Sequence, residues 1–500
     1  MTVAELLKDI KARRISGDLN REVKGIAYDS RLIKNDYLFT AIKGFSTDGH
    51  IYIENAISRG AVAVVAEESV NFCGSAAFIE VDDSRQAIAV LSAAFYKNPS
   101  SKLSLIGITG TNGKTTTSYI TKSILDAWGR RVGLLGTIRY ITGDRVIKAI
   151  HTTPESLDLQ MYLREMLDSH AEYAVLEVSS HALALKRVEG CSFKVGVFTN
   201  FTQDHLDFHG TMDGYFSAKT KLFDYVEDGG YAVLNRDDPR LRDLAGRLKC
   251  NVITCGLEEG AMLRAVNINS NKLKNPPVPP LVKGGEGGFS GLSFVIKTPS
   301  GELFIDSPLV GQNNVYNILM SVGIAYALGV SSDAIIKGIR EVKPVEGRFE
   351  KIDEGQRFLC ILDYAHTEDA LQRLIQEARL ITKGKVITVF GCGGDRDRGK
   401  RLKMGAVATE LSDVVIITSD NPRSEDPMQI INEIIKGIRK DNYTVLPERA
   451  EAVNKAVSIA EEGDTVLLAG KGHEDYQEIK GVRHPFSDRE AFSKAVNSEQ

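Results

Sequence analysis

The 500-residue sequence lacks the features that mark membrane, nucleic-acid-binding or secreted proteins. It has no apolar run near the ~18 to 20 residues that span a bilayer and, at a formal net charge of −4, no prominent basic tract. Neither a membrane nor a nucleic acid is therefore expected as a partner. The six cysteines show neither paired metal-ligand spacing nor disulfide density, which predicts reduced thiols in a cytoplasmic protein. Because the N-terminus mixes acids and bases on a helical pattern, we expect neither a signal peptide nor an anchor.

Length and patterning predict a three-domain α/β protein. Five hundred residues exceed what one hydrophobic core accommodates. Apolar runs alternate with helical patterns, which predicts sheets that are mostly parallel and wrapped by helices. We expect a small α/β substrate domain, a central phosphate-loop ATPase-like domain and a C-terminal Rossmann-like domain, at residues 1–98, 99–342 and 343–500. The expected strands lie at 37–42, 61–66, 77–81, 103–108, 132–135, 173–178, 195–198, 359–362, 386–390, 414–417 and 465–468.

The stretch Gly107 to Thr117, GITGTNGKTTT, predicts a phosphate-binding loop. An apolar run precedes it and an amphipathic helical pattern, clear from Tyr119, follows it. Glycines let the backbone close around phosphates, whose charge is met by amide N–H groups, a lysine and a hydroxyl that contacts Mg²⁺. The usual first glycine falls on Ile108, so the motif is a shortened variant. The positions that fill the four roles in order are Gly110, Gly113, Lys114 and Thr115.

Polar residues also follow the next strands of the expected central sheet. One strand leads into Glu177, and another leads into the run Asp204-His-Leu-Asp-Phe-His209. Because the carboxyl ends of parallel strands meet at one edge, Glu177 and His205 are expected beside the phosphate loop, where they could complete a Mg²⁺ shell begun by Thr115. The alternative is that Asp204 and Asp207 cap a helix and the histidines lie on the surface.

The remaining chain contains one irregular segment and four further polar clusters. Residues 271–290, rich in proline and glycine pairs, are expected to form a flexible surface insertion between two strands, without a catalytic role. The domain resumes at 292–296 and 309–311, followed by a helix from about Val315 that carries Asn314 and Asn317 near its start. Each strand of the third domain leads into a polar cluster, which places functional groups along one edge. These clusters are Asp363–His366, Gly391–Arg396, Ser419–Arg423 and Gly470–Glu474.

Eight motifs in a fixed order resemble those of the Mur ligases of peptidoglycan synthesis. The resemblance extends from about Asp29 to Glu490 and omits only the insertion. It implies that ATP phosphorylates the glutamate carboxylate of UDP-N-acetylmuramoyl-L-alanyl-D-glutamate to an acyl phosphate, which an amine then attacks to form an amide. The motifs are Thr109-Gly-Thr-Asn-Gly-Lys-Thr-Thr116, Glu177-Val-Ser-Ser-His181, Asp204-His-Leu-Asp-Phe-His209, Tyr215-Phe-Ser-Ala-Lys219, Asn235-Arg-Asp-Asp238, Gly347-Arg-Phe-Glu350, Asp363-Tyr-Ala-His366 and Asp420-Asn-Pro-Arg423.

The same resemblance implies roles for individual residues. The catalytic residues would be Lys114, His205 and Lys219. Carbamylation of Lys219 by CO₂ is implied, and two Mg²⁺ ions would be held by Thr115, Glu177, His205 and the carbamate of Lys219. The implied ATP contacts are Gly110, Thr111, Asn112, Gly113, Lys114, Thr115, Thr116, Asn314, Asn317 and Arg348. The implied contacts to the UDP substrate are Ser30, Phe45, Ser46 and Thr47 in the first domain, with Thr152, Thr153, Ser179 and Arg187 at its peptide end.

The motif Asp420-Asn-Pro-Arg423 bears on which amino acid is added. A substrate with a second, distal carboxylate needs a bidentate cation, which arginine supplies and lysine does not. The sequence DNPR resembles that of family members that add meso-diaminopimelate. The implied contacts to this amino acid are Arg396, Asp420, Asn421, Pro422, Arg423, Gly470 and Glu474. Addition of L-lysine or another diamino acid, a folylpolyglutamate synthase-like ligase and a nucleotide-gated binding module remain the alternatives, and we expect a monomer.

Four positions depart from the family pattern. Asn313 stands where an aromatic residue is usual, so the local packing of the adenine is expected to differ. His151 replaces a frequent asparagine and Leu185 a frequent glutamine near the peptide end. Glu368 stands where proline is common.

Overall fold

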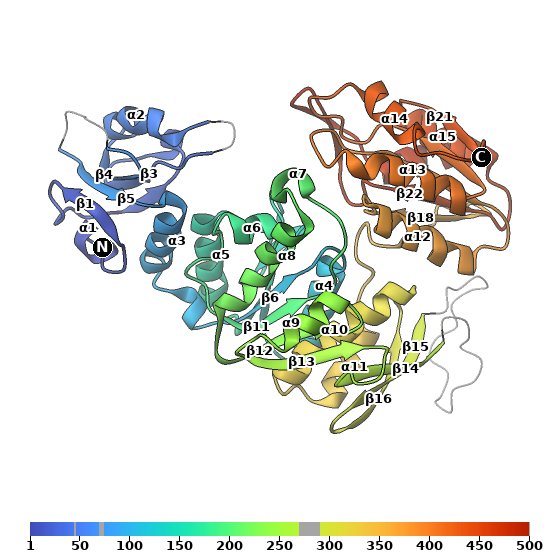
Figure 1. Cartoon of the computed structure of the whole chain (residues 1–500), viewed down its shortest axis with the longest axis horizontal. Coiled ribbons are helices and arrows are strands. Elements are labelled where there is room, and N and C mark those ends of the chain that lie inside the picture. The colour runs from blue at the N-terminus through green and yellow to red at the C-terminus, as the bar shows by residue number, and fades with distance from the viewer. Residues whose placement is uncertain (45–46, 70–74, 270–290, 500) are drawn as a thin grey trace.

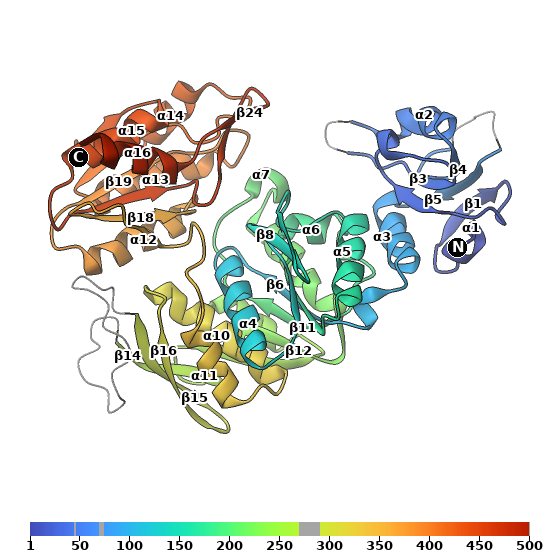
Figure 2. The same cartoon turned by 180° about the vertical axis from the view of Figure 1, so that it is seen from behind.

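The computed structural model describes residues 1–44, 47–69, 75–269 and 291–499. Three α/β units follow one another along the chain, each built on its own main sheet, and the first and last lie on opposite sides of the central one (Figures 1 and 2). The expected three-domain α/β organisation is thereby confirmed. The expectations for Phe45, for Ser46 and for the insertion at 271–290 lie outside the described residues.

The N-terminal unit is a five-stranded sheet in the order β1-β5-β4-β3-β2, parallel except for the pairing of β1 with β5. All six residues of β4 are buried, and β3 and β5 on either side of it are mostly buried as well. Buried parallel strands are continuous apolar runs, so the sequence predicts these three strands. The sequence did not predict β1, which is mostly exposed, or β2, which has three residues. The strands are β1 (Ala12–Ser16), β2 (Gly25–Ala27), β3 (Tyr37–Thr40), β4 (Ala61–Ala66) and β5 (Ala77–Val81), with helices α1 (Val3–Leu6), α2 (Ile53–Ser58) and α3 (Ser84–Phe95).

The central unit is an eleven-stranded sheet in the order β16-β15-β14-β13-β12-β11-β6-β10-β7-β8-β9. Its middle strands are parallel and apolar, and the strands at both ends pair antiparallel. The sequence did not predict end strands such as Arg139–Thr142 and Arg145–Lys148, because they are polar and partly exposed. The strands are β6 (Ser104–Thr109), β7 (Val132–Leu135), β8 (Arg139–Thr142), β9 (Arg145–Lys148), β10 (Tyr173–Glu177), β11 (Phe193–Phe198), β12 (Val226–Asn235), β13 (Asn251–Gly256), β14 (Leu263–Asn269), β15 (Leu292–Thr298) and β16 (Gly301–Ser307).

Helices cover both faces of the central sheet. One core joins the sheet to α4, α10 and α11, and another joins it to α5 and α6 on the opposite face (Figure 2). Two helices begin earlier than their amphipathic patterns indicated: α4 starts at Lys114 directly after Gly113, and α10 starts at Gln312 after Gly311. The helices are α4 (Lys114–Ala127), α5 (Ser156–Asp168), α6 (Ser180–Ala184), α7 (Leu206–His209), α8 (Met212–Thr220), α9 (Pro239–Ala245), α10 (Gln312–Ala327) and α11 (Ser332–Arg340).

The C-terminal unit is a six-stranded sheet in the order β17-β18-β22-β19-β20-β21, in which only β17 is antiparallel, beside a β23-β24 hairpin. The strands are β17 (Glu350–Ile352), β18 (Leu359–Asp363), β19 (Val386–Phe390), β20 (Val414–Ile417), β21 (Tyr443–Val445), β22 (Thr465–Ala469), β23 (Tyr476–Ile479) and β24 (Val482–Pro485). Its helices are α12 (Glu368–Ile381), α13 (Gly399–Leu411), α14 (Pro427–Ile435), α15 (Arg449–Ile459) and α16 (Asp488–Glu499). Of the helices that the structure describes, none is long and apolar enough to cross a membrane.

Candidate active site

A cleft of about 840 Å³ opens where the carboxyl edge of the central sheet faces that of the C-terminal sheet. It brings together most of the residues singled out in the sequence, from all three parts of the predicted site. Those that line it are Thr111, Asn112, Gly113, Lys114, Thr115, Thr116, Thr152, Thr153, Ser179, Arg187, His205, Asn314, Asn317, Arg348, Arg396, Asp420, Asn421, Arg423, Gly470 and Glu474.

Other residues of the predicted site lie behind or away from the cleft. Gly110, Glu177, Lys219 and Pro422 are not among its lining residues. Ser30 and Thr47 belong to the N-terminal unit and do not line the cleft either. Ser30 is buried at the start of a short 3₁₀ turn, and the Thr47 hydroxyl lies 3.4 Å from the Tyr52 hydroxyl.

The phosphate loop has a backbone that only glycine can adopt at two positions. Gly110 and Gly113 have φ of +143° and +84°. A Cβ at Gly110 would lie 1.9 Å from the Thr199 hydroxyl, and one at Gly113 would lie 2.4 Å from Asn317 Oδ1. Gly113 is also the N-cap of α4, and no side chain of the described residues caps this helix end. The first amides of α4 are therefore available to an anion.

Two lysines meet at one carbonyl group of this loop. Lys114 Nζ donates to the carbonyl oxygens of Gly110 and Thr111, both at 2.9 Å, and Lys219 Nζ donates to Gly110 O at 2.8 Å. Lys219, on α8, is 1% exposed and lies 4.6 Å from the centre of the Tyr215 ring. Burial lowers the pKa of Lys114, and burial together with the charge of Lys114 holds the pKa of Lys219 well below its usual value.

The hydroxyl of Thr115 and the carboxylate of Glu177 form the oxygen-rich part of the site. Thr115 Oγ1 donates to Glu177 Oε2 at 2.9 Å. Thr137, which the sequence did not single out, fixes the same carboxylate through its amide and its hydroxyl, each at 2.9 Å. Within the described ranges no group of three or more His, Cys, Asp or Glu side chains is arranged to hold a metal. A cation here would need further oxygen donors from a ligand or a modified side chain.

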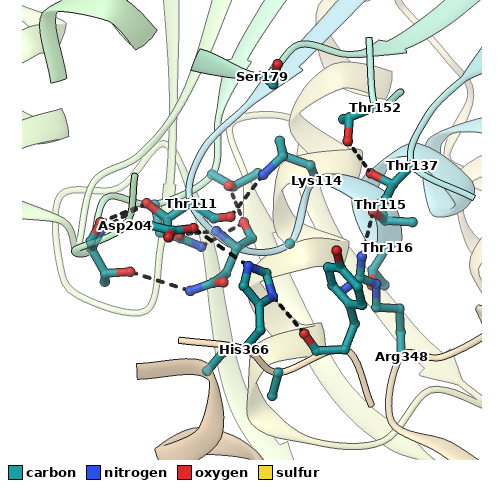
Figure 3. Close-up of a pocket in the computed structure, with 18 of the residues that line it drawn as sticks. Thr111, Lys114, Thr115, Thr116, Thr137, Thr152, Ser179, Asp204, Arg348 and His366 are labelled. Atoms are coloured by element: carbon teal, nitrogen blue, oxygen red, sulfur yellow. Dashed lines mark hydrogen bonds and ion pairs between the residues drawn. The ribbon is translucent and has the colours of Figure 1, made fainter. Parts of the chain in front are cut away.

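His205 belongs to a neighbouring cluster that the C-terminal unit completes. Its Nε2 atom lies 3.3 Å from Asp204 Oδ2, and its ring centre lies 4.7 Å from that of His181. The cluster is largely buried, and burial lowers the pKa of His181 to about 4. His366 Nε2 of the C-terminal unit lies 3.8 Å from Asp204 Oδ2 (Figure 3). Lys400 Nζ of the same unit lies 3.9 Å from Asp204 Oδ1. Asp204 is only 5% exposed and lies between cationic and imidazole groups of two units. It therefore does not fit the alternative interpretation of a helix cap at the surface.

Arg348 connects the C-terminal unit directly to the phosphate loop. Its Nη2 atom donates to Thr115 Oγ1 at 3.2 Å, and its guanidinium lies 4.6 Å from the centre of the Tyr364 ring (Figure 3). Next to it, Asn317 Nδ2 donates to Asn314 Oδ1 at 2.9 Å on α10. The predicted nucleotide contacts of two units are therefore assembled around one loop.

The peptide-end residues form a hydrogen-bonded wall beside Glu177. Thr153 Oγ1 donates to Glu177 O at 2.8 Å, and the Ser179 amide donates to Thr153 Oγ1 at 3.1 Å. Arg187 Nη1 donates to Thr153 O at 3.0 Å, while Thr152 and Thr137 hydroxyls lie 3.2 Å apart. The departures His151 and Leu185 also line this part of the cleft.

The other end of the cleft contains a buried ion-pair network. Lys471, which is fully buried, lies 3.4 Å from Asp420 Oδ1 and 3.2 Å from Glu474 Oε2. Asn421 Nδ2 donates to Glu474 Oε2 at 2.8 Å. Sequence reasoning included Gly470 and Glu474 but missed Lys471 between them, because nothing in the sequence shows that this lysine is buried.

Arg396 and Arg423 of the C-terminal unit also line the cleft. Arg423 has a positive φ of 52° and donates from Nη1 to Gly394 O at 2.7 Å, while Arg396 Nη1 donates to Asp395 O at 3.0 Å. Arg423 Nε lies 3.8 Å from Glu478 Oε2, outside hydrogen-bond distance. Each guanidinium therefore has donors left for an anionic ligand.

Three family models match the chain. The model described as Mur ligase family, catalytic domain, matches residues 22–96, Mur ligase middle domain matches 108–325, and Mur ligase, glutamate ligase domain matches 347–472.

Curated relatives match over nearly the whole length. A Solibacter usitatus protein named UDP-N-acetylmuramoyl-L-alanyl-D-glutamate--2,6-diaminopimelate ligase is 44% identical over 497 residues, which cover 98% of this chain and 97% of the relative. A Geobacter metallireducens protein of the same name is 42% identical over 518 residues, covering 99% and 98%. A solved structure bearing that name is 30% identical, with a TM-score of 0.66 and coverage of 100% and 99%. The chain belongs to the Mur ligase family.

Proposed function

We propose that this chain is an ATP-dependent amide ligase that joins meso-2,6-diaminopimelate to the D-glutamate carboxylate of UDP-N-acetylmuramoyl-L-alanyl-D-glutamate. The observation that carries the proposal is that the phosphate loop with Lys114 and the guanidinium of Arg423 line the same cleft. The cleft can therefore hold ATP and the amino-acid substrate, which is bound through its own carboxylate, next to the D-glutamate carboxylate that becomes activated. The names of the relatives supply the identity of the two substrates.

At the nucleotide end, catalysis consists of positioning and charge stabilisation. The uncapped amides of α4, Lys114 and Arg348 are the proposed contacts to the transferred phosphate, and the support is that all three meet at the phosphate loop. Asn314 and Asn317 on α10 are the proposed contacts to the base side of the nucleotide. Thr115 and Glu177 fit Mg²⁺, because a hydroxyl and a fixed carboxylate are the donors that this ion combines with substrate phosphates. When bound, Mg²⁺ neutralises charge on the phosphate oxygens.

The D-glutamate carboxylate attacks the terminal phosphorus of ATP, which breaks the bond to ADP and forms an acyl phosphate. The substrate amine, deprotonated, then attacks the acyl carbon, and collapse of the tetrahedral intermediate releases inorganic phosphate. His205 and Asp204 lie in the cleft beside the loop, where the neutral imidazole, whose pKa is lowered by burial, and the carboxylate can accept hydrogen bonds from the substrate amine, and the proton that the amine loses leaves to solvent. Cleavage of ATP to ADP and inorganic phosphate thereby drives the formation of one amide bond.

Lys219 is proposed to be carbamylated. Its depressed pKa favours the neutral amine, whose lone pair can attack CO₂ to give a carbamate and one proton. The product places an anion near the Lys114 ammonium, with which Lys219 shares the carbonyl of Gly110, and supplies oxygen donors for a second Mg²⁺. In ¹³C-labelled bicarbonate the wild type should show a carbamate NMR signal that Lys219→Arg lacks. A wild type without this signal contradicts the carbamate and leaves the ligase proposal standing.

The UDP substrate is proposed to extend from the N-terminal unit to the cleft. Ser30 and the loop Phe45 to Thr47 would bind the nucleotide-sugar end, and Thr152, Thr153, Ser179 and Arg187 the peptide end. The support is that all four residues of the second group line the cleft that also contains the phosphate loop.

Phosphate release with purified enzyme tests the proposal. Release should require ATP, the UDP-dipeptide and an amino acid together, and meso-diaminopimelate should be used in preference to L-lysine. The reason is that Arg396 and Arg423 match a distal carboxylate, which lysine lacks. Faster turnover with L-lysine would overturn the choice of amino acid, and absence of release with all three substrates would overturn the ligase function.

A further inference from the structure

Helix α12 of the C-terminal unit directs three charged side chains at the central unit. Asp369, Arg373 and Glu377 are spaced four residues apart, so they lie in one row along the helix. The buried apolar side chains that hold α12 on its own sheet occupy another face, at Leu371, Leu374, Ile375 and Ala378. The charged row is therefore not needed for the core of the C-terminal unit.

The first two members of the row form a continuous chain of hydrogen bonds between the two units. Asn112 Nδ2 of the phosphate loop donates to Asp369 Oδ2 at 3.0 Å. Arg373 Nε donates to Asp369 Oδ1 at 2.9 Å, and Arg373 Nη1 donates to Asn313 Oδ1 at 3.0 Å. Asp369 and Arg373 thus connect the phosphate loop to the start of α10.

The third member, Glu377, caps α10 from the other domain. Helix α10 begins after Gly311, which has no side chain to cap the first amides. Glu377 Oε1 accepts the Asn313 amide at 2.9 Å, and a Cβ at position 311 would lie 2.3 Å from Glu377 Oε2. The carboxylate occupies the place of an N-cap side chain at the positive end of the helix.

We propose that Asp369, Arg373 and Glu377 form an interdomain clamp that couples the placement of the C-terminal unit to the shape of the nucleotide site. All its anchor points in the central unit, Asn112, Asn313 and the first turn of α10, lie at the cleft. Asn313 accepts a hydrogen bond from Arg373 and donates its amide to Glu377, at a position where the family pattern has an aromatic residue. Its members are positioning residues for nucleotide binding.

A double-mutant cycle between the units tests the clamp. Arg373→Ala, Asn313→Ala and the double variant are titrated with a fluorescent ADP analogue, using the full chain and neither of the other substrates. Each single change removes the hydrogen bond between Arg373 and Asn313, Arg373→Ala also removes the one to Asp369, and each should weaken binding about tenfold. The double variant should be no weaker than the weaker single variant, because both changes break the same contact. Gln376→Ala, exposed on the same helix, is the matched control and should bind like wild type.

Two results overturn the clamp. One is an additive cycle, in which the factor by which the double variant weakens ADP binding equals the product of the factors for the two single variants. The other is unchanged ADP binding in Arg373→Ala and in Asp369→Asn, a second variant that keeps the shape of the side chain. Arg373→Lys should restore only part of the affinity, because a single ammonium lacks the planar fork with which the guanidinium reaches Asp369 and Asn313 from two different nitrogens. Since ADP titration involves no amino acid or UDP substrate, failure of the proposed ligase reaction would leave this test unaffected.

Discussion

The two ends of the cleft use lysine in opposite ways. At the nucleotide end, Lys114 and Lys219 are held by carbonyl oxygens, and in the part of the chain that the structure describes neither forms an ion pair within 4 Å. At the amino-acid end, Lys471 is buried between Asp420 and Glu474. Among the described residues, Lys114 and Lys219 therefore have no carboxylate partner at the first end, whereas the charge of Lys471 at the second end is balanced within the protein. The contrast predicts that Lys114 serves ligand binding and that Lys471 serves the stability of the C-terminal unit.

The largest effect is expected at the nucleotide end. Lys114→Met removes the cation that faces the transferred phosphate and should lower kcat/KM by about 10²- to 10³-fold, as for other preorganised charge stabilisers. Because burial already disfavours the charged form of Lys114, the same change should leave thermal stability unchanged or raise it. Phosphate release and thermal unfolding measure the two effects. A stable variant with nearly normal kcat/KM would contradict the role given to this lysine.

The next largest effect concerns the amino-acid end. Arg423→Ala should raise the KM for meso-diaminopimelate by a factor equivalent to about 2 to 5 kcal/mol, the usual cost of truncating a buried charge-assisted pair. The KM for ATP should change little, since the side chain of Arg423 contacts Gly394 and Glu478 of the C-terminal unit. Initial rates with each substrate varied in turn measure both constants. Equal increases in the two constants would refute the assignment.

Lys471→Met tests whether the second lysine is structural. It leaves two carboxylates, Asp420 and Glu474, buried beside each other without their cation, which should cost about 3 to 5 kcal/mol in stability. The unfolding midpoint of the C-terminal unit should fall, in contrast to Lys114→Met. If both lysine variants unfold like the wild type, the contrast between the two ends is wrong.

The smallest effect is a pH dependence from Glu377. Burial raises the pKa of its carboxyl from 4.5 to about 7, with Asp363 adding to the rise and Arg373 and the α10 amides opposing it. The docked state therefore binds the proton more tightly than a separated state would. The contribution of Glu377 to docking is present below pH 4.5 and is lost as the pH rises through about 7. ADP affinity of the wild type should fall relative to Glu377→Gln from about pH 5.5 to about pH 8; parallel curves would contradict this.

The sequence predicted the site better where its residues follow apolar strands. Glu177 ends the parallel strand β10, and the loop with Lys114 and the cluster containing Arg423 follow β6 and β20, so the shared edge could be inferred from the pattern. Contacts between different units leave no comparable pattern in the sequence. Asn313 with Arg373, and Asp204 with His366, are far apart in sequence and meet only through the docking of two domains. Thr137 was missed for a related reason, since a threonine after a short strand looks like any turn residue.

The measurement that tests the account most directly follows oxygen from the substrate to phosphate. UDP-dipeptide carrying ¹⁸O in the D-glutamate side-chain carboxylate is converted with ATP and meso-diaminopimelate, and the released phosphate is analysed by mass spectrometry. An acyl phosphate formed in this cleft transfers one ¹⁸O atom to each phosphate, together with formation of one amide bond. Unlabelled phosphate released at the rate of amide formation would contradict the mechanism.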